Sequence, residues 1–232
     1  MRTLHLIPVA IAAAAAAACG GDTCAVDTSY DPAIVPADFV AEVDHPLYPL
    51  PTGARWVYQA GDERVVVEVL SERRTILGVA AVIVHDQGSV AGELIEDTFD
   101  WLAQDRAGNV WYMGEATQEL DHGRVVSTEG SWEAGVDGAK PGILIPAAPA
   151  VGQPYRQEYS PCNAEDMGEV LATDASATVP TGSYTGCLKT RDFTPLEPAV
   201  DEEKYYCPGI GLVLTVDVGA GGAREELVEH TP

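Results

Sequence analysis

The stretch from Glu96 to Glu115 reads EDTFDWLAQDRAGNVWYMGE and decides the fold class. It carries Trp101 and Trp111 on either side of the turn Asp105-Arg106-Ala107-Gly108-Asn109. Both flanks mix aromatic, β-branched and polar residues, the composition that β-strands prefer. The stretch therefore predicts a central hairpin, with strands over 94–103 and 110–120.

Runs of similar composition continue on both sides of this hairpin, separated by turn residues at intervals of about ten positions. They cover 56–59, 64–70, 75–77, 79–85, 124–128, 142–145, 155–159, 169–173, 175–179, 184–190, 204–207, 212–218 and 225–228. A parallel α/β sheet would need amphipathic helices between the strands, and none is found after Gly53. We expect a mainly β fold, an antiparallel meander that forms a curved sheet, a sandwich or a partly open barrel, with little helix.

The register of the central hairpin decides which acidic side chains face one another. With a loop of two or four residues, Asp100 lies opposite Glu115, and Glu96 lies opposite Glu119. Like charges in directly opposite positions are destabilising. This register would therefore imply a bound divalent cation, or a proton that the two carboxylates share.

A three-residue loop with Gly108 in a left-handed bulge gives a different register. The facing pairs are then Asp105 with Asn109, Ala103 with Trp111, Trp101 with Met113, and Asp100 with Gly114. Because glycine adopts positive φ without steric strain, a D-x-x-G turn favours this geometry. We expect this second register, in which the acids form a solvated face.

The beginning of the sequence has the features of an export signal. Arg2 supplies a positive charge, and 4–18 is an apolar run too short for a stable membrane span. The sequence Ala16-Ala17-Ala18-Cys19-Gly20 resembles the lipobox of bacterial lipoproteins, with Ala16 where that family usually has Leu. The resemblance implies cleavage before Cys19, acylation of Cys19, and a lipid anchor in the bacterial cell envelope, with the outer membrane as the expected location. An ordinary secretory peptide cut at an A-x-A site is the alternative.

The sequence predicts three parts. Residues 1–18 are the cleaved lipoprotein signal peptide, residues 19–50 an extended tether, and residues 51–232 a single β domain. The tether is predicted because prolines are scattered through 20–50 without a sustained hydrophobic period.

The charge of the chain excludes one class of partner. The full sequence has a net charge of −23, and cleavage after residue 18 removes Arg2 and makes it more negative by one. Such a surface repels phosphate groups, so we expect no nucleic-acid partner. Contact with the membrane is expected through the lipid anchor alone.

The cysteines other than Cys19 are even in number, which suggests disulfides in an exported protein. Cys187 and Cys207 each lie in a predicted strand with a Pro-containing turn between them, so we expect a cross-strand disulfide there. Cys24 with Cys162 follows by elimination. No Cys-x-x-Cys occurs, which argues against a redox or zinc role.

Motifs of known catalytic centres are absent from the sequence, including G-x-S-x-G, S-x-x-K and H-E-x-x-H. We therefore assign no catalytic residue, no metal ligand and no cofactor, apart from the divalent cation that a carboxylate pair would attract. The candidate binding surface combines the central hairpin with the Gly- and Pro-rich excursion at 131–161. Its residues are Asp100, Trp101, Trp111, Glu115, Trp132 and Tyr155.

Several segments resemble a group of exported bacterial proteins and lipoproteins. These segments are the central hairpin, GSWEAGVDGAKPGI, QEYSPCNAEDMGEV and EKYYCPGIGLV. The group carries D-W-x-A-Q-D-x-x-G-N-V-W-Y-x-G-E and K-Y-Y-x-P-G-x-G-L-V. The resemblance covers most of the chain after Leu50 and implies a shared fold and an exported setting, but no catalytic residues.

Together these features predict a membrane-anchored extracytoplasmic lipoprotein with a β-rich binding or structural domain. Its expected partner is an unknown protein or small-molecule ligand. The alternative is a hydrolase that uses paired carboxylates, and a divalent cation, on an envelope or extracellular substrate.

Overall fold

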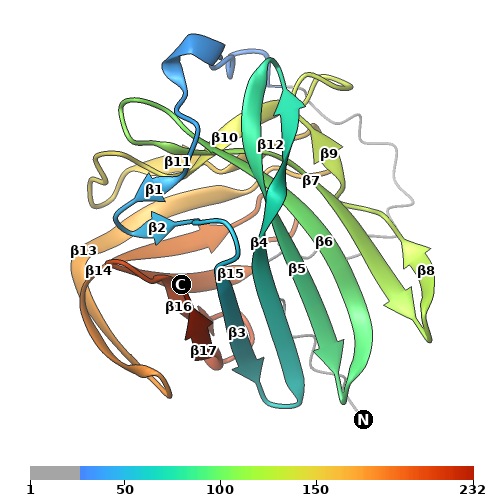
Figure 1. The fold of residues 1–232 in the computed structure, drawn as a ribbon, viewed down its shortest axis with the longest axis vertical. Helices are drawn as coiled ribbons and strands as arrows, with labels where there is room; N and C mark the ends of the chain where they lie inside the picture. Colours follow the sequence, from blue (N-terminus) through green and yellow to red (C-terminus); the bar gives the residue numbers. More distant parts are fainter. Residues whose placement is uncertain (1–26) are drawn as a thin grey trace.

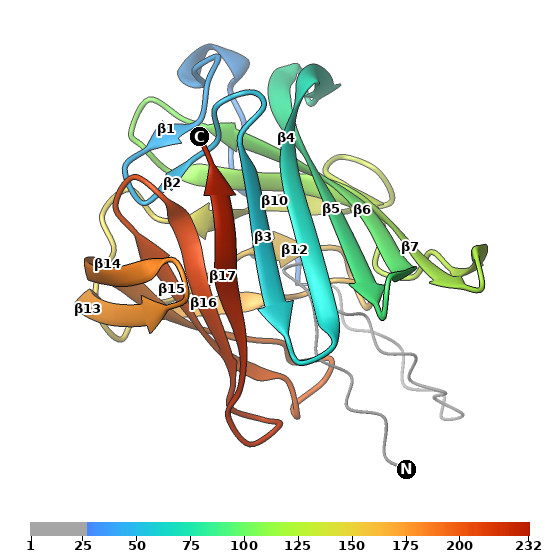
Figure 2. The ribbon, with the colours of Figure 1, turned by 60° about the horizontal axis from the view of Figure 1, so that its bottom comes forward.

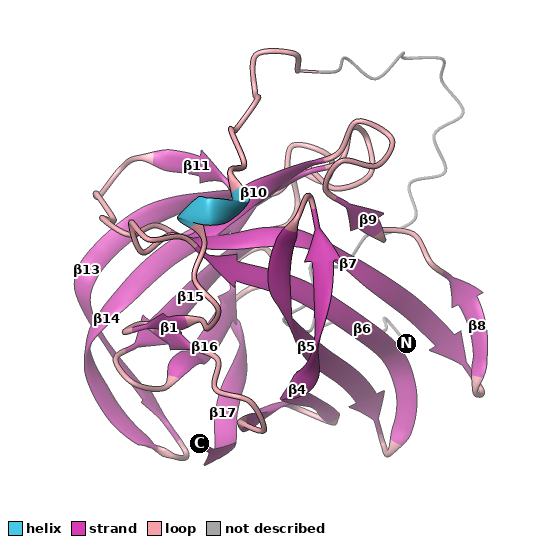
Figure 3. Cartoon of the chain, turned by 45° about the horizontal axis from the view of Figure 1, so that its top comes forward, coloured by secondary structure: helices cyan, strands magenta, loops and turns pink. Residues whose placement is uncertain are grey.

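The computed structural model describes residues 27–232, so the predicted signal peptide 1–18, the lipidated Cys19 and Cys24 lie outside the described residues. Within residues 27–232 the only helical element is the short 3-10 helix η1 (Pro36–Asp38). No helix of this part of the chain has the length and apolar character needed to cross a membrane. The prediction of a mainly β fold with little helix is confirmed (Figure 3).

The strands form one large antiparallel sheet and one small hairpin. The hairpin consists of β1 (Asp44–His45) and β2 (Tyr48–Pro49). The large sheet contains β3 (Arg55–Ala60), β4 (Glu63–Ile76), β5 (Val79–Val90), β6 (Glu93–Gln104), β7 (Val110–Asp121), β8 (Arg124–Ser127), β9 (Trp132–Glu133), β10 (Lys140–Ile145), β11 (Pro154–Arg156), β12 (Glu158–Tyr159), β13 (Met167–Val179), β14 (Gly182–Phe193), β15 (Asp201–Cys207), β16 (Gly211–Asp217) and β17 (Ala223–Thr231).

Most neighbouring strands in the sheet are also neighbours in the chain, which confirms the predicted meander (Figure 1). The run β3 to β7 and the run β13 to β17 join where β17 pairs with β3. The sheet is not closed into a barrel. Its two edges are brought together by one short segment, because β11 pairs with β13, β12 pairs with β10, and only Gln157 separates β11 from β12. Figure 2 shows the strongly curved sheet that results, with strands wrapped around an interior.

Strand β4 illustrates how the sequence defines this interior. Successive side chains of a strand point to opposite faces. Val65, Val67 and Val69 are 1%, 6% and 1% exposed, whereas Glu68 between them is exposed. Burial of each valine stabilises the fold by roughly 1.5 to 3 kcal/mol. The inner face of the sheet is therefore the core of the protein.

At its turn, the central hairpin has the register that we favoured. The backbone N–H of Asp105 donates to the carbonyl of Asn109 at 3.0 Å, and Ala103 faces Trp111. Gly108 has a φ of 100°, as the left-handed bulge requires. This part of the prediction is confirmed.

Farther from the turn, the favoured register is wrong, because Met113 forms an additional β-bulge. The bulge shifts the pairing by one residue, so that Trp101 faces Gly114. Asp100 consequently faces Glu115, and Glu96 faces Glu119, as in the register that we did not favour.

The physical reason for this bulge lies in Gly114, which has a φ of 137°. Strand β9 pairs with β7 at this point, and a Cβ on Gly114 would collide with the carbonyl oxygen of Trp132 and with Glu133. Only glycine tolerates this backbone conformation together with so close an approach.

Residues 27–50 also differ from their prediction, because they pack against the domain and do not form a free tether. The N–H of Val40 donates to the carbonyl of Gln104 at 2.9 Å. Val43 and Leu50 belong to the buried core. Scattered prolines suit an irregular packed segment as well as a spacer, and apolar side chains between them supply the contacts.

Cys187 in β14 and Cys207 in β15 form the predicted cross-strand disulfide. The other predicted pairing involves Cys24, so it falls outside the described residues.

Candidate functional site

Two cavities adjoin on the inner face of the sheet, next to the β1–β2 hairpin. The first has a volume of about 20 Å³ and is mainly apolar, and the second has a volume of about 30 Å³ and is partly charged. Each has room for roughly one or two water molecules, so a larger ligand would have to displace lining side chains. Tyr48 and Leu212 line both cavities. We call the two cavities together the inner chamber.

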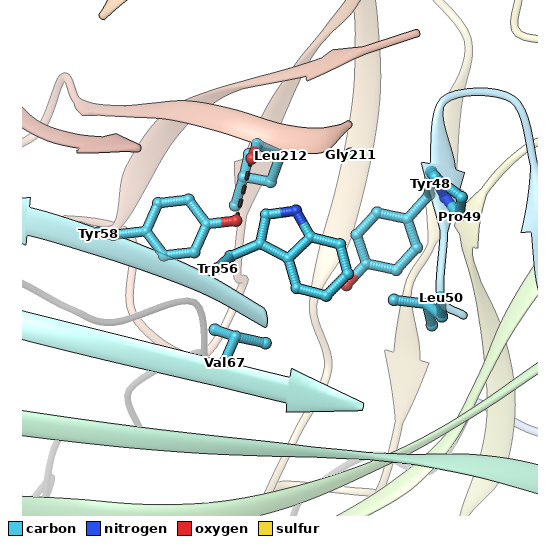
Figure 4. A pocket seen from close by; sticks show the side chains of 8 residues that line it. All are labelled: Tyr48, Pro49, Leu50, Trp56, Tyr58, Val67, Gly211 and Leu212. Carbon is cyan, nitrogen blue, oxygen red and sulfur yellow. Dashed lines mark hydrogen bonds between the residues drawn. The ribbon is translucent and has the colours of Figure 1, made fainter. Parts of the chain in front are cut away.

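Aromatic rings form the apolar part of the inner chamber. Figure 4 shows Trp56 between Tyr58 and Tyr48. The indole N–H of Trp56 donates to the carbonyl of Ile210 at 2.8 Å, and the hydroxyl of Tyr58 donates to the carbonyl of Leu212 at 2.9 Å. Because these polar atoms are satisfied by the backbone, the rings offer the chamber apolar surface.

Lys204 is the cation in the charged part. Its Nζ lies 3.2 Å from Asp192 and 3.3 Å from Glu202, and all three side chains are nearly inaccessible to solvent. Burial alone would lower the pKa of Lys204, but the two carboxylates outweigh burial and raise it. Lys204 therefore stays charged, and two acids already surround it.

Tyr112, which lines the charged cavity together with Asp100, joins Asp100 to Glu115. The Tyr112 hydroxyl lies 2.5 Å from Asp100 Oδ1 and 2.8 Å from Glu115 Oε2. Burial raises the pKa of Asp100 to about 6, although the Tyr112 hydrogen bond opposes the increase. Burial and the nearby charge of Asp100 raise the pKa of Glu115 well above its ordinary value. This arrangement is typical of two carboxyl groups that share a proton.

The interior contains many more acids than bases. Within residues 27–232, the buried acidic residues are Glu63, Asp86, Glu115, Glu158, Asp166, Asp192, Glu202 and Glu225, whereas Lys204 is the one buried lysine or arginine. Burial is the largest cause of the raised pKa of Asp86 and of Glu225. Burial likewise raises the pKa of Glu96 to about 7. Burial of these carboxyl groups therefore favours their neutral form.

Three residues of the predicted binding surface lie together. Asp100 and Glu115 share Tyr112, and the ring of Trp132 packs edge-on against Tyr112 with centroids 5.5 Å apart. The indole N–H of Trp132 donates to Glu158 Oε2 at 2.6 Å. Asp100 borders the inner chamber, whereas Glu115 and Trp132 are buried behind it.

The other three predicted residues lie elsewhere. Trp101 points to the opposite face of β6, where the Arg74 guanidinium stacks 4.0 Å above its ring. The indole N–H of Trp111 donates to Asp105 Oδ2 at 2.8 Å in the turn. Tyr155 packs closely against Gly168. The structure thus separates these residues from Asp100 and Glu115, and a binding role for them stays a prediction.

The sequence reasoning missed most of the chamber, including Tyr48, Trp56, Asp192, Lys204 and Tyr206. Tyr48 lies in the segment that we expected to be a tether. A usable signal existed in 202–206, where acid, lysine and tyrosine recur at every second position and thus share one face of a strand.

Metal binding has no geometric support in the part of the chain that the structure describes. There, no group of three His, Cys, Asp or Glu side chains is arranged to hold a metal ion. The facing of Asp100 and Glu115 is instead accompanied by the Tyr112 hydroxyl, which contacts both side chains, and by the raised pKa of both carboxyl groups.

No family model matches the sequence, and no curated protein matches it either. Among solved structures, the chain is similar to the crystal structure of a candidate lipoprotein from Parabacteroides distasonis ATCC 8503. The identity is 12% and the TM-score 0.42, over 80% of this chain and 98% of that one.

Proposed function

We propose that this protein is an exported, lipid-anchored protein of the bacterial envelope whose β domain binds a small molecule in the inner chamber. The observation that supports binding is the lining of the chamber, which is aromatic at one end and charged at the other. Ligand pockets are typically concave and mostly apolar, with a few polar groups that orient the ligand. Burial of Lys204 with two acids also costs desolvation energy that an apolar core would avoid, so a functional reason for it is expected.

Binding is favoured over hydrolysis by the position of the acids. A glycosidase needs two carboxyl groups that both reach the scissile bond. Asp100 borders the chamber, but its facing partner Glu115 is only 4% exposed and is held by Tyr112. The pair therefore lacks a second group that could act on a bound substrate.

The lipid anchor is supported by the sequence around Cys19 and is tested separately. Bacteria that produce the full chain are grown with an alkyne-labelled fatty acid, beside a Cys19→Ala variant. We expect label on the wild-type protein and none on the variant. A Cys24→Ala variant is the matched control and should keep the label. Unlabelled wild-type protein would contradict the anchor.

Ligand binding is tested with hexanol, a slender neutral probe, on the isotope-labelled mature chain that carries Cys19→Ala. The indole N–H of Trp56 is the reporter, because Trp56 lines the chamber, and Trp101 on the opposite face of the sheet is the internal control. We expect saturable NMR shifts of the Trp56 signal and a constant Trp101 signal. Absence of a saturable Trp56 shift would contradict binding in the chamber.

A further inference from the structure

We propose that the surface around the β4–β5 turn docks on the lipid bilayer that holds the anchor, with Val35, Leu77 and Val136 in contact with the lipid. This inference rests on the proposed lipid anchor. It adds a surface of the protein to a membrane contact that the sequence led us to expect through the lipid alone. It follows from a groove with exposed apolar side chains, from the backbone of Leu77, and from the short chain between Cys19 and the domain.

An open groove of about 440 Å³ lies between residues 31–34, the β4–β5 turn and the loop that precedes β10. Apolar residues and glycines line most of it. The two charged residues of the lining, Asp31 and Lys140, form an ion pair with a distance of 2.9 Å. The lining is therefore balanced in charge, although the whole chain carries a net charge of −23. Such a surface can approach a bilayer with anionic headgroups without strong repulsion.

Large apolar side chains are exposed at this groove. Val35, Leu77 and Val136 are 48%, 45% and 49% exposed. The β4–β5 turn packs against Pro36, next to Val35, and the Leu77 side chain packs against Gly135, next to Val136. The three exposed residues thus form one patch, which we call the docking patch. Exposed apolar patches are typical of surfaces that contact a membrane or another protein.

Leu77 occupies a backbone position where stability alone favours a different residue. It is the first residue of a two-residue turn, with a φ of 49°, and Gly78 follows with a φ of 82°. Turns of this kind prefer asparagine or aspartate before glycine, and a bulky side chain at positive φ is uncommon. The β5–β6 turn has a similar backbone but carries the small residue Ala91, with a φ of 52°. An exposed leucine at such a position indicates a function for its side chain.

The chain between the lipid and the domain is too short to hold the domain far from the bilayer. Asp27, the first described residue, is fixed on the domain. Its N–H donates to the Tyr159 hydroxyl at 2.5 Å, and its carboxylate lies 3.0 Å from the Arg156 guanidinium. Asp27 follows Cys19 by eight residues, so their Cα atoms are at most about 29 Å apart on any path. A free tether over 19–50 would reach more than about 100 Å.

This short connection joins the domain on the side of the groove. Asp27 is followed four residues later by Asp31, which lines the groove. Figure 1 shows the β4–β5 turn and the first described residues, in blue, at one end of the molecule and the β5–β6 turn at the other. The two ends of β5, Val79 and Val90, are about 36 Å apart. The anchor therefore holds the docking patch near the bilayer, with the β5–β6 turn farther away.

The test uses the lipidated protein, purified from bacteria and placed in nanodiscs of mainly phosphatidylethanolamine with some phosphatidylglycerol. A lipid with a gadolinium chelate on its headgroup broadens the NMR signals of amides close to the bilayer. Gly78 and Gly92 are the reporters, because they occupy similar turns at the two ends of β5. We expect Gly78 to be broadened at least about fivefold more than Gly92, since the effect falls steeply with distance along β5.

Variants then separate the docking patch from the short connection. Leu77→Asn should lower the ratio of Gly78 to Gly92 broadening by about twofold or more, and it should fold because Asn-Gly suits this turn. Val136→Ser is a second, independent variant with the same expected effect. Ala91→Asn is the matched control, because it places the same residue in the similar turn at the other end of β5. It should leave the ratio unchanged.

Each other outcome overturns a defined part of this proposal. Equal broadening of Gly78 and Gly92 in the wild type would overturn docking and leave the lipid anchor intact. A high ratio that neither Leu77→Asn nor Val136→Ser lowers would overturn the role of the docking patch. Signals of the patch that shift with protein concentration in the lipid-free Cys19→Ala chain would assign the patch to a second copy of the chain. Purified wild-type protein without fatty acid would contradict the anchor itself.

Discussion

Replacement of Asp100 by asparagine should stabilise the protein at neutral pH and change its stability little in acid. Asparagine has the shape of a protonated aspartic acid and can still accept the hydrogen bond from Tyr112. It lacks the charge that aspartate acquires as the pH rises. The variant thus removes the energetic penalty of placing this carboxylate in the interior.

The magnitude follows from the pKa of Asp100, which burial raises from 3.8 to about 6. Each pH unit between these values is worth about 1.4 kcal/mol, so the total is about 3 kcal/mol. The folded protein holds this proton more tightly than the unfolded chain does. The stabilising contribution is therefore fully present below the unfolded pKa and is lost as the pH rises through the folded pKa. Above that point the wild type carries the full penalty, and the variant carries none.

Urea unfolding, followed by tryptophan fluorescence from about pH 3.5 to pH 7.5, measures the effect. The advantage of Asp100→Asn over the wild type should grow by about 3 kcal/mol across this range. The reasoning is refuted if the difference does not vary with pH, or if the variant is the less stable protein near pH 7.5.

Asp105→Asn is a matched control in the same hairpin, with the opposite sign. Burial alone would raise the pKa of Asp105, but hydrogen bonds from Asn109, Trp111 and backbone N–H groups outweigh it and lower the pKa. Such a carboxylate stabilises the fold above its unfolded pKa, and this contribution is lost in acid. The variant should lose on the order of 1 to 2 kcal/mol at neutral pH and less at low pH.

The bulge, the disulfide and the buried indole each give a further prediction for urea unfolding. Gly114→Ala should lower the free energy of unfolding by about 2 to 4 kcal/mol, because its Cβ would collide with β9. The control Gly123→Ala lies in an open turn and should lower it by about 1 kcal/mol. Equal losses for the two variants would contradict this packing. The double variant Cys187→Ala/Cys207→Ala should lose about 3 kcal/mol relative to the wild type when both proteins are oxidised, and nothing when both are reduced. Trp132→Phe should lose about 1 to 3 kcal/mol because it removes the donor to a buried carboxyl group, and an unchanged midpoint would contradict that role.

The fold class could be predicted from the sequence because its signals are local. Alternation in RVVVEVL, the glycine at 108 and the spacing of turns each depend on a few adjacent residues. The Cys187–Cys207 disulfide was also predictable, since both cysteines lie in strands joined by one turn. These features follow from propensity and pattern without knowledge of distant contacts.

Most of the candidate site could not be predicted, although Asp100 and Glu115 were among the predicted residues, because its geometry depends on contacts between distant segments. The bulge at Met113 depends on β9, a strand that follows β7 later in the chain. Strand β9 approaches the backbone of β7 closely at Gly114, and this contact cannot be read from the hairpin sequence alone. One inserted residue changes which side chains face one another, so it converted the expected solvated face into the Asp100–Glu115 pair. Tyr48 reaches the chamber from a segment whose prolines indicated a spacer.

Titration of the Asp100 carboxyl carbon by NMR tests the buried pair of Asp100 and Glu115 most directly. The carboxyl group should titrate near pH 6, because burial disfavours its charged form. Titration near the ordinary value of 3.8 would contradict a carboxyl group buried beside Tyr112 and Glu115.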